Sequence, residues 1–441
     1  MQARLRLAVA LSACLAYGGG ASAIAQVGGD SVMHDPSRII KDGNHYYVYG
    51  TALGGADGIF FKHSTNLTTW YDPYNNAEAN AIFSDAPAWI ASEVPGNDGT
   101  FWAPSVIQYG DEYRLYYSVS TFGGQESAIG LATNTTLNFT DPAYQWIDQG
   151  VVTKSEVGYP YNTIDASVFV DATDRMWMTF GSYWNGIFVT ELDPVSGKPY
   201  DATPAGATRI AGRSGGTDIE ASYMHYHDGY YYLFVNWGSC CSGVDSTYEI
   251  RVGRSTSPAG PFVDNSAQPR SMISGGGTLF LDDVDNRIGP GHAGIFSEDG
   301  VDYFGFHFYD ANSNGVPRFA IDELLWTVDG WPILLQEVLA ADLSGDGNLT
   351  LRDWAIFRTY HLTDMSMLSP EVQAARGDLD GDGDNDFDDF RRFQTSYNAL
   401  NGDGEFEAML RAVPEPAAAL LAAMASLLLL RRNGGKQSRR A

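Results

Sequence analysis

The sequence predicts an all-β protein, a five-bladed β-propeller, followed by a small α-helical module. A strand–turn–strand pattern occurs five times between residues 34 and 310. Aromatic residues make up 13% of the chain and glycines number 49, which suits many short strands joined by tight turns. After residue 340 this pattern gives way to two acidic loops, each followed by a helix-like stretch. With 441 residues, the chain can hold one large domain and a smaller one.

The five repeats share a short motif at their start. HDPS begins at residue 34, WAPS at 102, IDAS at 164, IEAS at 219 and GHAG at 291. Each motif leads into an aromatic strand, a polar turn and a second strand, and the spacing leaves room for about four short strands per repeat. In a propeller the innermost strands line a central channel, so the second residues of the motifs are expected to form a ring at its mouth. These residues are Asp35, Ala103, Asp165, Glu220 and His292.

Four of the five predicted ring positions hold ionisable side chains. Ordinary solvated carboxylates are the alternative, but they would not return to the same register by chance. Inverting hydrolysis of a glycosidic bond uses an acid that protonates the leaving oxygen and a carboxylate that activates water, about 6.5–9.5 Å apart. Glu220 stands between Ile219 and Ala221, and apolar surroundings raise the pKa of an acid. We therefore expect Glu220 as the acid, Asp35 as the base and Asp165 as a third carboxylate that tunes the acid.

The charge of the chain restricts its partners. The formal net charge is −27, and many of the basic residues lie near the two ends. Without residues 1–25 and 431–441, 20 basic residues remain against 54 acidic ones. Such a surface repels nucleic acids and anionic polymers, and it favours a neutral substrate or a cation.

The first 25 residues form a predicted secretory signal peptide. Arg4 and Arg6 precede an apolar run from Leu7 to Tyr17, and small residues follow. Its removal would leave two of the three cysteines, Cys240 and Cys241, which are adjacent. A framework of several disulfides is therefore excluded. The pair is either a vicinal disulfide or two packed thiols, and the sequence leaves both open.

Residues 413–441 carry three features in order: the motif VPEP, an apolar run from Ala417 to Leu430, and Arg431-Arg432. The run is short for a membrane span, and it lacks the polar face of a surface helix. The segment resembles the PEP-CTERM sorting signal of Gram-negative bacteria. This resemblance implies secretion across the inner membrane, sorting machinery at the membrane as a partner, and delivery to the cell surface or the medium, with transient anchoring through this segment.

The predicted propeller spans residues 30–338, and from about His34 to Pro332 it resembles the arabinanases of glycoside hydrolase family 43. The motifs that carry the resemblance are HDPS, FWAPS, NTIDASVF, FGSYWNGI, IEASY, YEIRVGRSTSPAGPF, GPGHAG and DGWP. The resemblance implies hydrolysis of α-1,5-linked L-arabinan with inversion, with Asp35 as base, Asp165 as pKa modulator and Glu220 as acid. It also implies a hydrated calcium ion near His292. The residues expected to contact the sugar are Trp102, Gly123, Asn162, Thr163, Ile164, Ser182, Tyr183 and Trp184.

An endo-acting arabinanase is the leading hypothesis, and alternatives compete with it. An exo-arabinanase, α-L-arabinofuranosidase or β-xylosidase of the same family would differ in the loops that close the groove, which the sequence does not show. A non-catalytic sugar-binding propeller has no use for an acid, a base and a modulator together. A sialidase propeller would repeat the box S-x-D-x-G-x-T-W, which this sequence does not do. Trp102, expected to stack on the sugar, has the alternative of packing between blades.

Residues 340–402 resemble a type I dockerin. DLSGDGNLTLRD (342–353) and DLDGDGDNDFDD (378–389) place oxygen ligands at alternate positions and glycine at the sixth, as calcium loops do. Acidic turns without metal are the alternative. The resemblance implies one calcium ion in each loop and raises two hypotheses, a cohesin-like partner or a stabilising module beside a surface anchor. The expected ligands are Asp342, Ser344, Asp346, Asn348 and Asp353 in the first loop, and Asp378, Asp380, Asp382, Asp384 and Asp389 in the second.

Overall fold

The computed structural model describes residues 27–51, 58–74, 81–266, 268–327, 329–402 and 404–412. The predicted signal peptide (1–25) and the predicted sorting segment (413–441) lie outside the described residues. Within the described ranges, no helix is long and apolar enough to cross a membrane.

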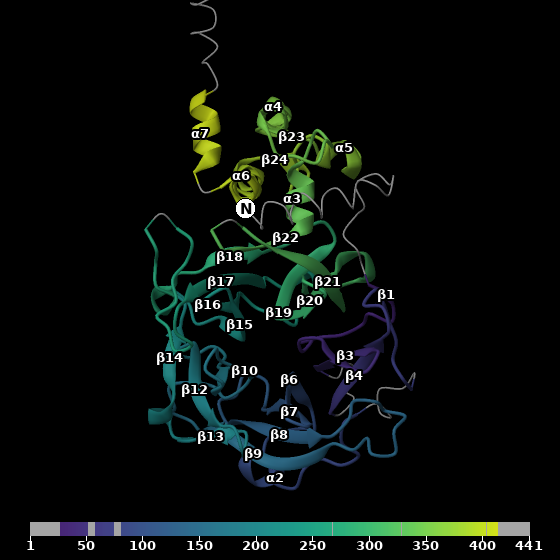
Figure 1. The fold of residues 1–441 in the computed structure, drawn as a ribbon, viewed down its shortest axis with the longest axis vertical. Coiled ribbons are helices and arrows are strands. Elements are labelled where there is room, and N and C mark those ends of the chain that lie inside the picture. The colour runs from purple at the N-terminus through teal and green to yellow at the C-terminus, as the bar shows by residue number, and fades with distance from the viewer. Residues whose placement is uncertain are drawn as a thin grey trace, which may run out of the picture.

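Five antiparallel sheets stand around a common centre and form the predicted five-bladed β-propeller (Figure 1). The first blade contains β2 (Ile40–Asp42), β3 (His45–Thr51) and β4 (Ile59–Ser64). The second contains β6 (Phe101–Tyr109), β7 (Glu112–Val119), β8 (Ser127–Asn134) and β9 (Ile147–Ser155). The third contains β10 (Ser167–Val170), β11 (Met176–Phe180), β12 (Ile187–Asp193), β13 (Lys198–Pro199) and β14 (Thr208–Ala211).

The fourth and fifth blades are complete four-stranded sheets. The fourth contains β15 (Ile219–His227), β16 (Tyr230–Trp237), β17 (Glu249–Ser255) and β18 (Thr278–Leu281). The fifth contains β19 (Arg287–Glu298), β20 (Val301–Asp310), β21 (Val316–Trp326) and β22 (Pro332–Leu334). Short helical turns interrupt the connections: α2 (Ile90–Glu93), η2 (Pro204–Gly206), η3 (Gly243–Asp245), η4 (Met272–Ser274) and η5 (Ala311–Ser313).

The N-terminal segment closes the ring of blades. Val32 pairs with Arg318 of β21, and the Met33 amide donates to the Pro317 carbonyl at 3.1 Å. Behind these bonds, Phe319 of the fifth blade packs in one core with residues of the first blade. The short strands β1 (Gly28–Gly29) and β5 (Thr69–Trp70) also pair here, in parallel. Residues about 290 positions apart are thus held together, which fixes the first blade next to the last.

The described residues after the propeller are mainly helical. They form α3 (Leu335–Ala341), α4 (Leu351–Tyr360), α5 (Pro370–Ala374), α6 (Phe387–Asn401) and α7 (Glu405–Ala412), with the strand pair β23 (Thr363–Asp364) and β24 (Asp384–Asn385). Thr350 caps α4 and Asp386 caps α6, each in a reciprocal capping box with the acidic residue three positions later. Phe357 and Phe393 are fully buried in the core that joins α4 and α6. The two loop-plus-helix units therefore pack on each other.

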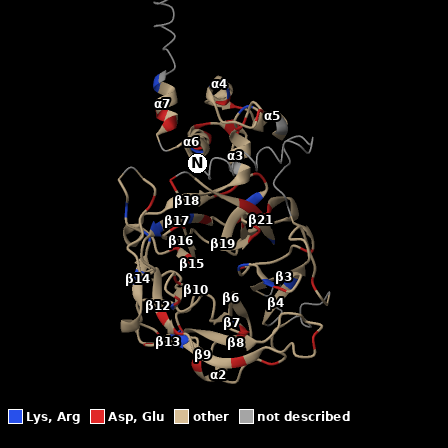
Figure 2. Ribbon diagram, in the orientation of Figure 1, with Lys and Arg blue, Asp and Glu red and all other residues tan. Residues whose placement is uncertain are grey.

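The helix α3 spans the predicted boundary between propeller and module. Gln336 donates to Asp322 of β21 at 2.7 Å, and Val338 packs with Ile333 of β22 and Ala399 of α6. A second contact joins Asp285, in the turn before β19, to the carbonyl of Asp380 at 3.4 Å. Figure 1 shows the module seated over the edge of the fourth and fifth blades. Figure 2 shows acidic positions on both parts.

Candidate active site

Each blade has a non-glycine residue in the left-handed backbone region, either within its first strand or shortly before it. The φ angles of these five residues lie between 46° and 59°. Non-glycine residues seldom adopt this conformation, so its recurrence marks one structural position in all blades. In the blades where the ladder continues past this position, it coincides with a β-bulge. The five residues are Asp35, Ala103, Asp165, Ala221 and His292.

The predicted alignment of the fourth repeat was wrong by one residue. The structure places Ala221, not Glu220, in the left-handed position of the ring. Glu220 pairs with Asn236 at the end of β16, just as Trp102 pairs with Ser118 in the second blade. The motif IEAS resembles IDAS in letters, but the backbone bulge comes one residue later. Glu220 therefore approaches the channel from the position before the ring.

Hydrogen bonds between adjacent blades hold the ring. The amide of the left-handed residue donates to a side chain at the end of the preceding blade's second strand: Ala103 to Thr51 Oγ1 at 2.9 Å, Asp165 to Ser118 Oγ at 3.0 Å. The amides of His292 and Asp35 donate likewise to Asn236 Oδ1 and His307 Nδ1, both at 3.2 Å. Each bond ties one blade's entrance to its neighbour.

The third blade breaks this pattern. Its equivalent position is Gly181, whose φ is +128° and where a Cβ would lie 2.4 Å from the Gly186 carbonyl oxygen, so no side chain fits. The amide of Ala221 donates instead to Asp165 Oδ2 at 3.0 Å. The Asp165 carboxylate thus replaces the missing partner and fixes the backbone next to Glu220.

Asp35 is buried and surrounded by donors. Its Oδ1 lies 2.7 Å from His34 Nδ1 and 2.9 Å from His292 Nδ1, and its Oδ2 accepts a 2.6 Å bond from Thr51. Burial opposes ionisation, but the two histidines outweigh burial and hold the pKa of Asp35 well below its usual value. Asp35 is therefore an ionised carboxylate at neutral pH, as a base must be.

The pKa of Glu220 is shifted in the opposite direction, upward. This residue is buried, and burial raises its pKa above the usual value although Ser182 and Tyr248 donate hydrogen bonds to it. The Ser182 hydroxyl lies 2.6 Å from Oε2, and the Tyr248 hydroxyl donates to Oε1. Burial, with further increases from Glu220 and Asp35, raises the pKa of Asp165 to about 7. Both Glu220 and Asp165 therefore hold a proton to higher pH than a solvent-exposed carboxyl group does.

Five of the predicted sugar-contacting residues, all in the third blade, form two groups in the structure. Asn162, Thr163 and Ile164 are buried, and Asn162 Oδ1 accepts a 2.6 Å bond from Ser127, so these residues build the wall of the site. Tyr183 and Trp184 are half-buried, and the Tyr183 amide donates to the Ile219 carbonyl at 2.8 Å, directly before Glu220. This second group borders the acid.

Trp102 and Gly123 lie at the mouth of the second blade. Trp102 is half-buried and precedes Ala103, whose amide shares Thr51 with Asp35. Gly123 is exposed and faces open space. Next to it, Phe122 is 85% exposed, an aromatic ring that the sequence interpretation passed over. Exposed aromatic rings at a channel mouth suit the apolar faces of sugars.

Four contacting residues were also missed from the sequence. His34 and Thr51 bond Asp35, Tyr248 bonds Glu220, and the fully buried His307 accepts the Asp35 amide. His34 stands next to Asp35 in the HDPS motif, which could have identified it. The other three lie at the ends of second or third strands, where single letters carry no repeat signal.

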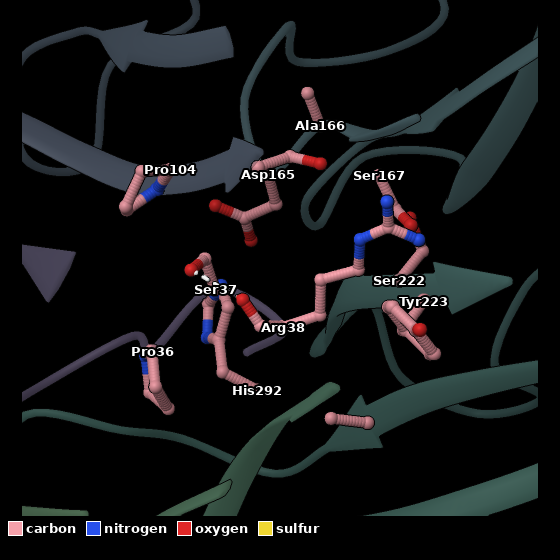
Figure 3. Close-up of a pocket in the computed structure, with 12 residues that line it drawn as sticks. Pro36, Ser37, Arg38, Pro104, Asp165, Ala166, Ser167, Ser222, Tyr223 and His292 are labelled. Atoms are coloured by element: carbon pink, nitrogen blue, oxygen red, sulfur yellow. Dashed lines mark hydrogen bonds between the residues drawn. The ribbon is translucent and has the colours of Figure 1, made fainter. Parts of the chain in front are cut away.

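A pocket in the channel is lined by residues of all five blades, with Asp165 and His292 among them. Figure 3 shows the side chains of Asp165 and His292 near Ser37, with Arg38 extending toward Ser222. Although burial lowers it, the Asp35 carboxylate and the two other carboxylates raise the pKa of His292 to about 9. Three carboxyl groups act on His292, and their negative charge would attract a cation to this place. A metal at His292 would have to displace the proton that the histidine holds.

The second acidic loop also fits a cation. Asp378, Asp380 and Asp389 bring carboxylate oxygens within 4.8 Å of one another, as do Asp384, Asp386 and Asp389. Buried oxygens of Asp380 and Asp384 have no hydrogen-bond partner.

Among the described residues, the first loop forms no such cluster of three. Asp342 and Asp353 accept amide protons of their own loop, with Ser344 donating to Asp353 at 2.9 Å. Asp346 and Asn348 are held by local bonds of the turn. Asp382, in the second loop, accepts from the Asp384 amide at 3.2 Å.

Comparisons with known proteins bear on this site. The family model "Glycosyl hydrolases family 43" matches residues 30–332. An extracellular endo-alpha-(1->5)-L-arabinanase of Bacillus subtilis is 38% identical over 73% of this chain and 94% of its own length. An extracellular exo-alpha-(1->5)-L-arabinofuranosidase of Cellvibrio japonicus is 34% identical over 71% of this chain and 89% of its own.

Solved structures show the same relationship. The GH43 endo-arabinanase from Bacillus licheniformis is 40% identical with a TM-score of 0.62, covering 70% of this chain and 99% of that one. A Cellvibrio cellulosa alpha-L-arabinanase complexed with arabinohexaose is 34% identical with a TM-score of 0.62, covering 69% and 96%. Both matches span the length of a propeller and leave about 30% of this chain unmatched.

Proposed function

The chain belongs to glycosyl hydrolase family 43, and we propose that it hydrolyses the α-1,5-L-arabinofuranosyl bonds of arabinan with inversion, acting within the polymer. The observation that carries this proposal is the contrast between two buried carboxyl groups of one channel. Histidines hold the pKa of Asp35 low, whereas burial raises the pKa of Glu220. One group is ready to accept a proton and the other to donate one.

The chemistry follows from these protonation states. The Glu220 carboxyl transfers its proton to the glycosidic oxygen as the bond from that oxygen to the anomeric carbon breaks. A water molecule forms the new bond at the same carbon from the opposite face, and Asp35 accepts the proton that this water loses. Asp165 holds the Ala221 amide, and its negative charge disfavours ionisation of Glu220. Trp102, Phe122 and Tyr183 provide aromatic surface around the mouth.

A hydrated calcium ion near His292 is part of the proposal. The carboxylates of Asp35, Asp165 and Glu220 face His292 and supply the negative charge that such an ion requires. When bound, the ion would offset part of the negative charge of these carboxylates and orient water. The proposed catalytic proton transfers belong to Asp35 and Glu220.

Endo action is supported by the names of the relatives at 38% and 40% identity, whereas relatives at 34% include exo-acting enzymes. The products formed from debranched arabinan test this proposal. A ladder of arabino-oligosaccharides early in the reaction is expected of an endo enzyme, and arabinose alone would identify an exo enzyme. Proton NMR of the first product is expected to show the β-anomer, because inversion reverses the α configuration. No hydrolysis of any arabinan would contradict the function.

For the remaining segments we propose the roles that the sequence suggests. Residues 1–25 direct export, in keeping with relatives named extracellular, and residues 413–441 sort the protein at the membrane. Residues 340–402 bind calcium, with the second loop supported by its clustered carboxylates. The packing of α3 and α6 supports a stabilising role for this module in preference to a cohesin-like partner. Fluorescence of a calcium-titrated sample and detection of the protein in cell fractions test these proposals.

A further inference from the structure

One loop of the fourth blade touches the proposed acid directly and is connected to the proposed base through two other side chains. It connects β16 to β17 and comprises residues 238–248. At its end, the Tyr248 hydroxyl donates to Glu220 Oε1. Near its start, Cys240 and Cys241 form a disulfide, and the Cys241 amide donates to the Tyr309 hydroxyl at 2.7 Å. The sequence had left the state of these cysteines open, and the structure shows them bonded.

From Tyr309 a chain of hydrogen bonds continues to the base. The Tyr309 hydroxyl lies 2.6 Å from His34 Nε2, and His34 Nδ1 lies 2.7 Å from Asp35 Oδ1. An ionised carboxylate can only accept, so Nδ1 of His34 carries the proton. Nε2 of His34 is left to pair with the Tyr309 hydroxyl. The chain of hydrogen bonds therefore runs from the Cys241 amide through Tyr309 and His34 to the Asp35 carboxylate.

The disulfide holds the first member of this chain. Cys241 has a φ of 68°, in the left-handed region that non-glycine residues seldom adopt. A bond between adjacent cysteines closes a small ring around their peptide group, which limits the backbone conformations of both residues. The Cys241 sulfur also lies 4.0 Å from His34 Nε2. Cys241 is solvent-exposed, so a reductant can reach the bond.

Other groups also surround Asp35. His292 and His307 face Asp35 from the fifth blade, at 2.9 and 4.0 Å, and Thr51 bonds its second oxygen. Its charge also acts on the buried carboxyl groups of Asp165 and Glu220. These contacts keep Asp35 in the site, whereas the chain through Tyr309 is the route by which the disulfide reaches it.

We propose that the Cys240–Cys241 disulfide is a positioning element of the active site. By fixing the Cys241 amide on Tyr309, it sets the orientation of the His34 ring and so aims the Asp35 carboxylate at the attacking water. This inference rests on the proposed function, because it requires Asp35 to be the base. Cys240, Cys241, Tyr309 and His34 are then positioning residues.

The test is reduction of the purified full chain with a phosphine reductant, with free thiols counted and folding followed by circular dichroism. Steady-state kinetics on linear arabinan are measured before and after. We expect kcat to fall about tenfold with KM little changed, since a small displacement of a positioned catalytic group costs up to about 10²-fold. The variant Cys240→Ser/Cys241→Ser should start at the lowered kcat and should not respond to reductant. Val244→Ala, an exposed change in the same loop, should behave as wild type.

Two tyrosine variants identify the route. Tyr309→Phe removes the middle of the chain, so reduction should cost this variant nothing further, because coupled groups are not additive. Tyr248→Phe acts on the acid at the other end of the loop, and reduction should lower its kcat by the same factor as in wild type. The imidazole nitrogen spectrum should show His34 protonated at Nδ1 in the oxidised wild type. After reduction, or in Tyr309→Phe, Nε2 loses its hydrogen bond with Tyr309, so the Nε2 resonance should shift while Nδ1 stays protonated.

Three results would overturn the inference. They are an unchanged kcat in protein whose disulfide is shown to be broken, an equal loss on reduction of Tyr309→Phe, and an unchanged His34 spectrum. Failure of the proposed function gives a different result: the oxidised wild type would not hydrolyse arabinan, or Asp35→Asn would retain its activity. Both of these outcomes are measured without reductant, so they are distinct from a failure of the disulfide proposal.

Discussion

Two regions of this chain bury several carboxyl groups close together. The oxygens of these groups find their hydrogen-bond partners in different ways in the two regions. In the propeller channel, Asp35 and Glu220 bond histidine, tyrosine and hydroxyl groups, most of which come from other parts of the sequence. In the second acidic loop, Asp378 and Asp389 accept amide protons of the same loop, and an oxygen of Asp380 has no partner. The channel is organised by the fold itself, whereas the loop has unsatisfied oxygens that a cation would complete.

The largest expected effects come from removing one of the two channel groups. Asp35→Asn and Glu220→Gln should each lower kcat on arabinan by about 10²–10⁴-fold, because each loses one proton transfer in the transition state. Substrate binding and folding should remain, since both replacements are close in size. Kinetics and thermal melting of the purified variants provide the measurement.

The leaving group separates the two roles. Glu220→Gln should be impaired less on an aryl arabinoside with a good leaving group, because such a group departs without protonation. Asp35→Asn should gain nothing from that substrate, since water activation is what it lacks. An equal loss for both variants on both substrates would contradict the assignment of acid and base.

The second expected effect concerns the stability of the module that contains the acidic loops. Burial and neighbouring aspartates raise the pKa of Asp380 to about 6, and burial raises that of Asp389 to about 7. Folded pKa values above the usual 3.8 mean that the metal-free module is most stable below about pH 4 and loses stability as pH rises toward 7. Calcium should remove this dependence by replacing the protons.

Limited proteolysis with and without chelator, at pH 5 and pH 8, measures this effect. We expect residues 342–412 to be cut in chelator at pH 8 while the propeller stays intact. Asp389→Asn should weaken calcium binding, whereas Asp388→Asn, an exposed neighbour on the same helix, should not. Equal resistance at both pH values in chelator would show that the loop needs no cation.

The architecture was predictable because each blade repeats the same sequence pattern, which forms a sheet that is not stable alone. A short aromatic strand, a polar turn and a second strand cannot bury their faces alone, so five copies imply a closed ring. The same repeats located Asp35, Asp165 and His292 correctly in one ring. Glu220 was placed one residue off, because IEAS and IDAS look alike while the bulge that decides the register depends on three-dimensional pairing.

The partners of the carboxyl groups were harder to predict. His307 and Tyr309 lie on the second strand of the fifth blade, and Tyr248 ends the loop before the third strand of the fourth, where their letters do not repeat. Their contacts with Glu220, Asp35 and His34 depend on how the blades close around the channel. By contrast, both helical caps of the module could be read locally, because a capping box needs only residues three positions apart.

A third, smaller effect concerns the charge of Asp165. Asp165→Asn removes a negative charge from beside Glu220, which makes ionisation of Glu220 easier and lowers its pKa. The acid form of Glu220 is then lost at lower pH, so the alkaline limb of the profile of kcat/KM against pH should move to lower pH. The amide of asparagine can still accept the Ala221 proton, which preserves the backbone. A stationary limb in a folded variant would leave Asp165 with only its backbone role.

The smallest expected effect comes from ending the chain after Ala341. This removes both acidic loops but keeps α3, with its bond from Gln336 to Asp322. The lost contacts are Ala399 against Val338, and the bonds to the turn at residues 283–285. A loss of about 1 kcal/mol would lower Tm by roughly 2–4 °C, and kcat/KM should not change, because the described partners of the channel carboxyl groups lie within the propeller.

The truncated chain also separates the two proposed calcium sites. Without the loops, chelator should have no target except the site near His292. If that site holds calcium, activity should still depend on calcium, and His292→Ala should abolish the dependence. Activity that is indifferent to exhaustive chelation would exclude a functional metal in the channel and leave the loop proposal untouched. The protonated His292, with its pKa raised to about 9, would then be the cation that balances the three carboxyl groups, and the channel would be complete without a metal.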